Sequence, residues 1–443
     1  MTGPTSPAPI SLIRALDSGP VYEQRGRIVG ALGTTLRVRG VKAKIGDSCQ
    51  IIDPESDTTL WAEVVGLSGE DAILTPLGDL RGLSTNSEVI LRSGEDQVPV
   101  GMDLLGRVLD ARLQPLDSFG PISRNSCRPL ISPSPNPLHR QVIDQPMETG
   151  LRAIDGLMTL GIGQRVGIFA AAGCGKSTLL ALLARQAKAD AIVIALIGER
   201  GREVREFVED VLGAEGLERS VVIVATSDRP AMERVRAAQV ATAIAEGMRE
   251  QGKHVLLLMD SVTRYARALR EIGLSAGEPA VRRGFPPSVF AELPKLFERA
   301  GSDATGAITG IYTILLEEED GDPIGEEVRS LLDGHITLSR RLAGQGHFPA
   351  IDVNDSLSRL FPKLARPEQQ QAAQSMRAML QKLDEIELVV QMGDYEPGRD
   401  RLADAAIEAR DAMTEFLRQS SGDVTPMAHS IARLRGLGGD HVD

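Results

Sequence analysis

The stretch VGIFAAAGCGKST, residues 166–178, decides the fold of this chain. An apolar run at 166–169 enters a glycine-containing loop, and the loop leads directly into LLALLAR, residues 179–185, a good helix former. Strand, glycine loop and helix in this order are the context of a phosphate-binding loop, whose backbone N–H groups and helix N-terminus attract an anion. The alternative for this segment alone is an ordinary turn between a strand and a helix.

Each residue type in the loop suits a nucleotide. Gly173 and Gly175 allow the backbone to approach a phosphate closely, Lys176 can reach the β- and γ-phosphates, and the Ser177 hydroxyl can bind Mg²⁺. The candidate nucleotide-binding residues of the loop are therefore Gly173, Cys174, Gly175, Lys176, Ser177 and Thr178.

Two residues need separate comment. Ala170 stands where the pattern GxxxxGK[ST] has its first glycine, so a strict pattern search misses this loop. Cys174 could be a site of thiol modification, but a small buried side chain is the favoured interpretation.

Further apolar runs follow at 191–197, 220–224 and 255–259, separated by helical stretches. Continuous apolar strands of this kind are buried on both faces of a parallel sheet, so the alternation predicts an α/β domain. The run at 255–259 ends in Asp260, which places a carboxylate at the carboxyl edge of the sheet, beside the loop. Asp260 and Ser177 are the candidate Mg²⁺ ligands.

The sequence IGERGRE, residues 197–203, also follows an apolar strand and brings Glu199 to the same sheet edge. A carboxylate there can orient and activate water for attack on the γ-phosphorus, and Glu199 is better placed for this than Glu203 or Glu206. The alternative is a solvated run of charges that opens a helix. Arg359, at the end of FPAIDVNDSLSR (348–359), would by itself be taken for a partner in a surface ion pair.

The flanking regions differ from this core. Short β-type runs between turns at 20–95 predict a small β-barrel, which we expect to serve oligomerisation, and residues 1–19 read as a flexible N-terminus. The core is assigned to 96–362, with a Pro- and Ser-rich extended connector at 115–146. Two stretches of helical periodicity predict a helical C-terminal domain at 363–443.

Composition narrows the class of protein. The formal net charge is −12, which argues against a surface that attracts nucleic acid or anionic lipid throughout. The three cysteines are far apart in sequence and form no CxxC pair, so neither a zinc cluster nor a disulfide scaffold is indicated. No signal peptide and no membrane-spanning run is recognisable, and we expect a cytoplasmic protein that reaches a membrane only through partners.

Several segments together resemble the rotary-type hexameric ATPases, the family of the ATP synthase α and β subunits, and within it the ATPases of type III secretion systems and flagellar export. The segments that carry the resemblance are residues 197–207, 260–266, 284–290, 332–340 and 348–359. The loop at 170–177 and DPIGEEVRS at 322–330 look like the virulence or symbiosis injectisome branch, in which Ala170 is an expected feature. The resemblance implies a RecA-like core.

The resemblance also assigns roles to residues. It implies that Lys176 and Glu199 are catalytic, with Arg200 as a supporting charge. Arg359 matches the arginine finger that is inserted into the neighbouring protomer's site. Phe348 matches the aromatic that packs on adenine, where the synthase β subunit usually has Tyr.

The resemblance implies an ATP- and Mg²⁺-dependent homohexamer at the inner-membrane face of the secretion apparatus. Its expected partners are stalk and stator proteins, the export gate and chaperone–effector complexes, with chaperone release and effector unfolding before export. Alternatives are a flagellar export ATPase with the same mechanism, a Rho-like RNA-dependent ATPase, and a non-catalytic ring subunit. The Rho-like and the non-catalytic readings are disfavoured. Residues 20–100 hold only two aromatics, Trp61 and Tyr22, and Lys176, Glu199 and Asp260 are all present.

Overall fold

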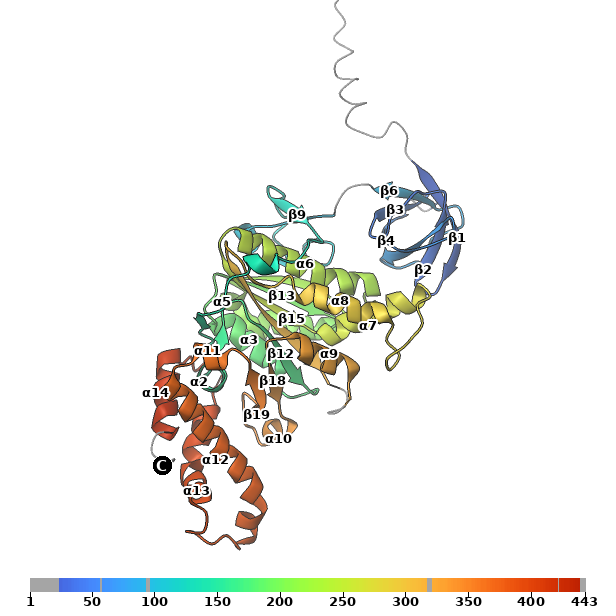
Figure 1. Cartoon of the computed structure of the whole chain (residues 1–443). Coiled ribbons are helices and arrows are strands. Elements are labelled where there is room, and N and C mark those ends of the chain that lie inside the picture. The colour runs from blue at the N-terminus through green and yellow to red at the C-terminus, as the bar shows by residue number, and fades with distance from the viewer. Residues whose placement is uncertain (1–23, 56–57, 93–95, 317–320, 421, 439–443) are drawn as a thin grey trace, which may run out of the picture. The chain divides into compact units, whose positions relative to one another are not determined.

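A computed structural model describes residues 24–55, 58–92, 96–316, 321–420 and 422–438 (Figure 1). The chain divides into two compact units, residues 1–95 with 275–277 and the remainder, and each is described by itself. The N-terminal segment expected to be flexible, 1–19, lies outside the described residues.

The first unit contains a closed antiparallel barrel with the strand order β1-β2-β5-β4-β3-β6. Its strands are β1 (Arg25–Leu32), β2 (Thr35–Arg39), β3 (Ser48–Asp53), β4 (Thr58–Ser68), β5 (Asp71–Leu77) and β6 (Glu88–Arg92). Alternate residues of the strands fill the interior, as in β3, where Cys49 and Ile51 are fully buried. Closure leaves no unpaired strand edge, which confirms the predicted small β-barrel.

The second unit is built on a sheet with the order β19-β18-β12-β17-β15-β13-β14-β8, and β16 pairs with β17 off this path. The strands are β8 (Val108–Asp110), β12 (Arg165–Ala170), β13 (Ala191–Ile197), β14 (Ser220–Ala225), β15 (His254–Asp260), β16 (Gly301–Ser302), β17 (Ala307–Leu315), β18 (Gly334–Leu338) and β19 (Ile351–Ser358). All pairs from β18 to β8 are parallel, whereas β19 is antiparallel to β18. Every residue of β13 and β14 is buried, as the apolar runs predicted.

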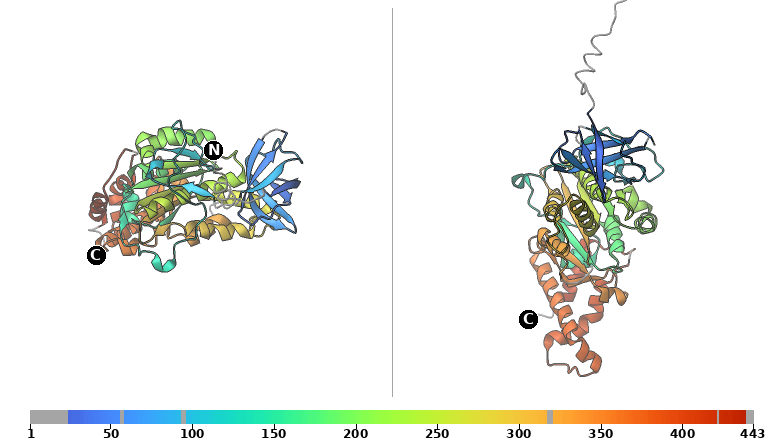
Figure 2. Two further views of the ribbon diagram at one scale, coloured as in Figure 1. Left: turned by 90° about the horizontal axis from the view of Figure 1, so that it is seen from above. Right: turned by 90° about the vertical axis from the view of Figure 1, so that its right-hand side faces the viewer.

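Helices lie on both faces of this sheet (Figure 2). They include α3 (Lys176–Gln186), α4 (Gly201–Glu206), α5 (Gly213–Glu218), α6 (Ala231–Glu250), α7 (Val262–Ser275), α8 (Pro287–Phe297) and α9 (Pro323–Leu331). A π-helical turn, Phe207–Leu212, joins α4 to α5 and was not foreseen from the sequence. The predicted α/β core is confirmed.

The first part of the second unit is largely irregular, and it includes residues 115–146, which the sequence predicts to be an extended connector. Its short elements are β7 (Gln97–Pro99), η1 (Met102–Leu104), β9 (Cys127–Pro129), η2 (Pro137–His139) and β10 (Pro146–Met147), which pairs with β11 (Leu160–Gly161). β7 and β9 form a small antiparallel pair.

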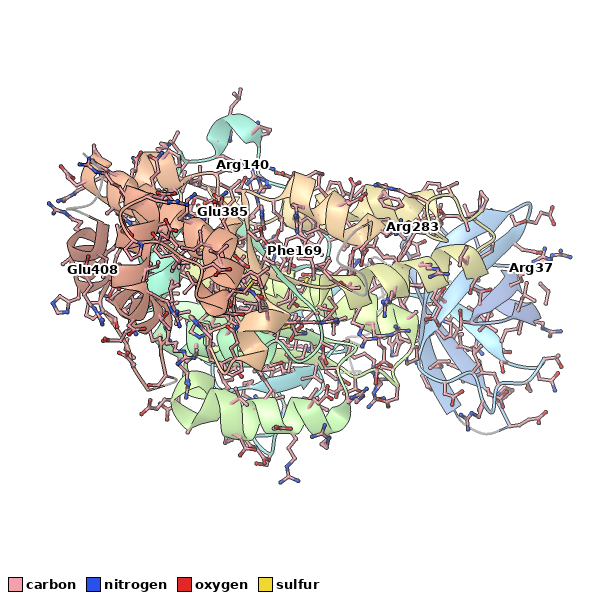
Figure 3. The ribbon with its side chains drawn as sticks, turned by 90° about the horizontal axis from the view of Figure 1, so that it is seen from below. Arg37, Arg140, Phe169, Arg283, Glu385 and Glu408 are labelled. Atoms are coloured by element: carbon pink, nitrogen blue, oxygen red, sulfur yellow. The ribbon has the colours of Figure 1, made fainter. Side chains whose placement is uncertain are left out.

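The C-terminal region is helical, and its buried apolar side chains belong to the same apolar cluster as those of the sheet. It comprises α12 (Pro367–Met392), α13 (Arg401–Leu417) and α14 (Met427–Gly438), preceded by α10 (Arg340–Gly344) and α11 (Phe361–Leu364). Met376, Met413 and Phe416 are fully buried in one apolar cluster with α2 (Arg152–Leu157) and the strands. Glu385 of α12 and Glu408 of α13 (Figure 3) are exposed on the helices. The sequence predicted two of these helices and missed α14.

Candidate active site

The glycine loop connects β12 to α3, and two of its residues have a left-handed backbone. Gly173 has φ 83° and Gly175 has φ 81°, conformations that side chains with a Cβ rarely adopt. Gly175 is the N-cap residue of α3, so Lys176 begins the helix. Ser177 and Thr178 are exposed in the first turn of α3. Cys174 is buried, as expected for a small side chain that packs inside the loop.

Lys176 meets two carboxylates at the carboxyl edge of the sheet. Its Nζ donates to Asp260 Oδ1 and lies 3.4 Å from Glu199 Oε1. Asp260 ends β15, and Glu199 follows β13, the strand paired with it in parallel. The Thr313 hydroxyl donates to Asp260 Oδ1 at 2.7 Å and fixes this carboxylate from β17. The structure thus brings together three residues that the sequence separates by up to 84 positions.

Burial and charge act in opposite directions on this cluster. The side chains of Lys176, Glu199 and Asp260 are 11%, 18% and 3% exposed. Desolvation lowers the pKa of Lys176, but the charges of Asp260 and Glu199 outweigh it, so the pKa of Lys176 lies above its usual value. Desolvation raises the pKa of Glu199, and Lys176 opposes that rise without cancelling it. A carboxylate with a raised pKa is a stronger base, which suits proton abstraction from water.

Arg264 belongs to the same cluster and was missed by the sequence reasoning. Its side chain lies against the loop that carries Glu199, because a Cβ on Gly198 would be 3.0 Å from Arg264 Cβ. Its positive charge lowers the pKa of Glu199, and its buried Nε has no hydrogen-bond partner among the described residues. No local signal marks it, because Asp260 ends β15 and Arg264 lies in the first turn of α7, so helical spacing does not relate the two residues.

Phe348 lies beside the glycine loop. A Cβ on Gly175 would be 3.3 Å from Phe348 Cε1, which places the ring against the loop. The side chain is 45% exposed, unusually open for a large aromatic in a folded core. An aromatic face is therefore available next to the phosphate-binding loop for a planar ligand group.

Arg359 is held elsewhere. Its guanidinium donates to the Arg329 carbonyl at 3.4 Å, and the side chain is exposed. Within the described part of the chain it has no hydrogen bond to Lys176, Glu199 or Asp260. Arg329 in turn lies over the ring of Phe169 on β12, 4.7 Å from the ring centroid.

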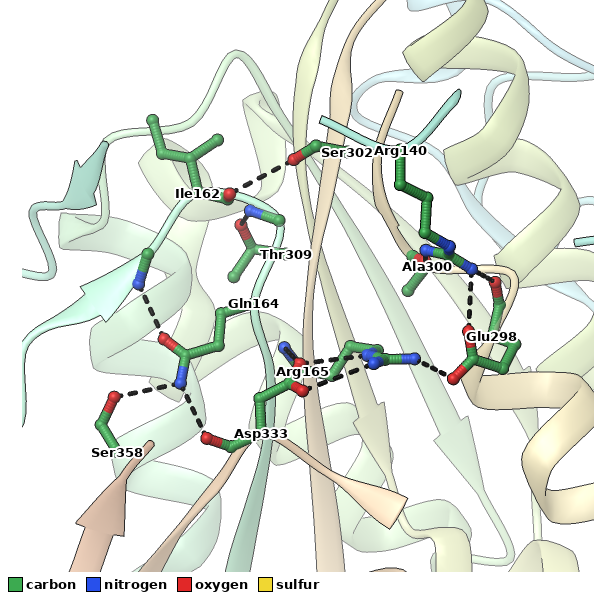
Figure 4. Close-up of polar contacts among 12 residues, drawn as sticks. Arg140, Ile162, Gln164, Arg165, Glu298, Ala300, Ser302, Thr309, Asp333 and Ser358 are labelled. Atoms are coloured by element: carbon green, nitrogen blue, oxygen red, sulfur yellow. Dashed lines mark hydrogen bonds and ion pairs between the residues drawn. The ribbon is translucent and has the colours of Figure 1, made fainter. Parts of the chain in front are cut away.

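Ser358, the residue before Arg359, and Asp333 are hydrogen-bonded to Gln164 and Arg165 at the start of β12 (Figure 4). Gln164 Nε2 donates to Ser358 Oγ at 3.0 Å and to the Asp333 carbonyl at 3.1 Å. The Arg359 N–H donates to the same Asp333 carbonyl at 3.0 Å. Arg165 Nε binds the Asp333 carboxylate at 3.1 Å and so holds that turn. Arg359 therefore projects from a rigid support.

Arg200 faces solvent. Its side chain is 76% exposed and pairs with Glu203 on the next turn at 2.9 Å. Among the described residues, Arg200 has no hydrogen bond or ion pair with Lys176, Glu199 or Asp260 that would make it a supporting charge there.

The donor set fits Mg²⁺ held with a nucleotide. Mg²⁺ prefers oxygen ligands and takes one or two from the protein, with phosphates and water completing the octahedron. The Asp260 carboxylate and the Ser177 hydroxyl supply such oxygens at the mouth of the loop. Among the described residues there is no group of three or more His, Cys, Asp or Glu side chains that could hold a metal ion.

Family models match most of the chain. Residues 28–92 match the ATP synthase alpha/beta family, beta-barrel domain, and residues 150–358 match its nucleotide-binding domain. Residues 365–436 match the T3SS EscN ATPase C-terminal domain. None of the helices in the described ranges is long and apolar enough to span a bilayer.

Similar proteins cover nearly the full length. A type 3 secretion system ATPase of Xanthomonas euvesicatoria is 50% identical, covering 97% of this chain and 98% of that protein. A flagellum-specific ATP synthase of Pseudomonas aeruginosa is 44% identical, covering 96% and 94%. The assembled ATPase EscN from the type III secretion system of enteropathogenic E. coli has a TM-score of 0.89 at 47% identity, covering 94% of this chain and 100% of that chain. The chain therefore belongs to the type III secretion ATPases within the ATP synthase alpha/beta family.

Proposed function

We propose that this chain hydrolyses ATP in an Mg²⁺-dependent reaction, as a homohexameric ring whose sites are each shared by two neighbouring copies. The observation that carries the proposal is the convergence of Lys176, Glu199 and Asp260 beside a glycine loop at the carboxyl edge of a parallel sheet. Phosphoryl transfer needs positioning and charge stabilisation more than covalent chemistry, and these three groups supply both.

The residues act in a definite order. Without nucleotide, Lys176 is neutralised by Asp260 and Glu199. When phosphates enter the loop, Lys176 turns to them and frees both carboxylates. Glu199 then accepts a proton from the water that attacks the γ-phosphorus, and ADP leaves as the bond between the β- and γ-phosphates breaks. Asp260 and Ser177 would hold Mg²⁺, which would supply positive charge to the phosphates. Arg264, whose buried Nε has no hydrogen-bond partner among the residues that the structure describes, stabilises negative charge in the same crevice.

The base of the nucleotide packs on Phe348, and Arg359 completes a different site. Phe348 lies on the glycine loop with an open face. Arg359 follows β19 at the edge of the sheet, and in the described ranges it has no hydrogen bond to Lys176, Glu199 or Asp260, as a group that acts on a neighbour requires. A copy that carries both halves on different surfaces makes a head-to-tail interface, and such interfaces close as rings. The solved structure of assembled EscN supports this arrangement.

The ring energises type III protein export, and its outer partners follow from the family. A solved EscN structure contains the central stalk EscO, and it matches this chain with a TM-score of 0.86 at 46% identity. The proposed partners are a stalk protein, a stator, the export gate at the cytoplasmic face of the inner membrane, and chaperone–effector complexes. ATP hydrolysis would release the chaperone and unfold the effector before export. Export through a flagellum is the second candidate, since a flagellum-specific ATP synthase is 44% identical.

Mixed rings test the shared site. Lys176→Ala and Arg359→Ala proteins should each be inactive, and an equal mixture should regain roughly a quarter of the sites, because those interfaces combine an intact loop with an intact finger. The matched control is a mixture of Lys176→Ala with Asp260→Asn, whose lesions lie in the same half and should restore nothing. Ring mixing is verified by native mass spectrometry. Mixed rings that regain no activity in the first mixture would contradict the shared site.

A further inference from the structure

Gln419 is a buried amide two residues beyond the end of α13, and it is 5% exposed. Its Nε2 donates to the carbonyls of Gly150 and Asp423, both at 2.6 Å. Its Oε1 accepts the N–H of Arg152 at 2.9 Å. Three side-chain hydrogen bonds to main-chain groups fix both the side chain and its own backbone, because an unmade bond to a buried polar group is costly.

The backbone of Gln419 holds the loop that carries Phe348. The Gln419 N–H donates to the Phe348 carbonyl at 2.9 Å. Next to it, Arg418 Nη2 donates to the Gln345 carbonyl at 3.3 Å. Residues 345–348 are therefore attached at two points to the end of a C-terminal helix.

The same helix end is attached to the sheet unit through Arg152. Its Nε donates to the Phe416 carbonyl at 2.9 Å, and its Nη1 binds the Asp423 carboxylate at 2.6 Å and the Thr425 hydroxyl at 3.0 Å. The Arg152 side chain is 5% exposed, so its bonds to the Phe416 carbonyl and the Thr425 hydroxyl are buried, whereas the Asp423 carboxylate is partly open to solvent. The chain of contacts runs from α2 through Gln419 to Phe348 and ends on Gly175 of the phosphate-binding loop.

We propose that Gln419 is a positioning residue for the nucleotide base: it fixes the Phe348 ring over the glycine loop and makes base affinity depend on how the C-terminal helices are seated. This inference rests on the proposed function, in which Phe348 receives the base. Gln419 does not contact the reacting phosphates, so its removal should weaken binding of the base and leave the chemical step intact.

The expected signature is a split between KM and kcat. Stacking of a base on an aromatic side chain contributes roughly 5- to 150-fold in affinity, and a displaced ring loses a large part of it. Gln419→Leu, which keeps the volume and removes the hydrogen bonds, should raise KM for ATP about tenfold and change kcat by less than about twofold. The inhibition constant of tripolyphosphate, which has no base, should stay within about twofold.

A double-mutant cycle with Phe348→Ala separates positioning from general support. If Gln419 acts through Phe348, the double variant should be no weaker for ATP than Phe348→Ala alone, because residues that act through one another are not additive. Arg418 is exposed, and Arg418→Met removes only its hydrogen bond to the Gln345 carbonyl at the start of residues 345–348. This variant should raise KM for ATP about threefold. Asp384→Asn is the matched control, since it breaks an exposed pair with Arg341 at 3.0 Å between α12 and α10 and should leave KM unchanged.

The outcomes are distinguishable. If Phe348→Ala leaves KM for ATP unchanged, the base assignment in the proposed function is wrong. If Phe348→Ala raises KM but Gln419→Leu and Arg418→Met do not, Gln419 has no positioning role. Equal shifts for ATP and tripolyphosphate, or additive effects in the cycle, would also overturn the inference, because they indicate a general loss of structure. Measurements use the full chain with ring assembly verified in each sample.

Discussion

Replacing Lys176 by Met should destabilise the nucleotide-free protein as well as remove turnover. Lys176 is the cation that neutralises Asp260 and Glu199, and Met has nearly the same volume without the charge. Two carboxylates would then face each other with Asp260 only 3% exposed. Breaking a buried pair by removing one partner costs about 3–5 kcal/mol. Glu199 is more open to solvent, and the Thr313 hydroxyl still binds Asp260, so we expect about 3 kcal/mol.

That loss translates into a measurable shift. With an unfolding entropy of roughly 2.1 cal/mol/K per residue over about 350 residues, 3 kcal/mol lowers the melting temperature by about 4 °C. The deficit should shrink as the pH falls. Lys176 lowers the pKa of Glu199, so its removal raises that pKa further, and protonation of Glu199 then relieves the repulsion.

Differential scanning calorimetry of nucleotide-free protein between pH 6 and pH 8 provides the test. Lys176→Met combined with Asp260→Asn is the control, because it removes the cation together with the more buried of its partner charges and should recover most of the lost stability. A Lys176→Met variant that melts with the wild type at every pH in this range would refute the idea that Lys176 neutralises the two carboxylates before nucleotide binds.

Other consequences concern catalysis. Glu199→Gln should bind ATP normally and lower kcat at least ~10²-fold, measured by equilibrium binding and steady-state hydrolysis; an unchanged kcat would remove Glu199 as the base. The pKa of Glu199 is raised by burial, so kcat should fall with decreasing pH from a point above the usual carboxylate range. A profile that stays flat down to that range would contradict this assignment. Arg264→Met should lower kcat more than it raises KM for ATP, and the reverse pattern would make it a binding residue. Asp260→Asn should raise the Mg²⁺ concentration needed for half-maximal turnover, and an unaltered Mg²⁺ titration would exclude it as a ligand.

Much of the nucleotide-binding core could be predicted because its signals are local. The strand, loop and helix around residues 166–185 are contiguous, and the apolar runs of β13, β14 and β15 are long enough to mark buried parallel strands. The position of Asp260 and Glu199 beside Lys176 could be predicted, because Asp260 ends one such run and Glu199 follows another after a single glycine. Alanine instead of glycine at position 170 is compatible with this loop, because Ala170 is the fully buried last residue of β12. It comes before Gly173 and Gly175, which have the left-handed backbone.

The parts that were missed depend on contacts between distant segments. Nothing local marks Gln419, because its partners Gly150 and Phe348 lie 269 and 71 positions away, and only folding brings them together. α14 has few strongly apolar residues, so its helical period is weak in sequence, although Leu434 is buried in the apolar cluster that also holds residues of α2, α12 and α13. Arg264 is one arginine among many, and its place beside Glu199 follows from the pairing of β13 with β15.

The way Arg152 holds the end of α13 bears on how this protein can evolve. Most of its bonds reach main-chain carbonyls of residues 415–418, which every amino acid provides. Substitutions on the solvent-facing side of α13 therefore leave these bonds intact. Related proteins can change that face while they keep the same attachment of α13 to α2.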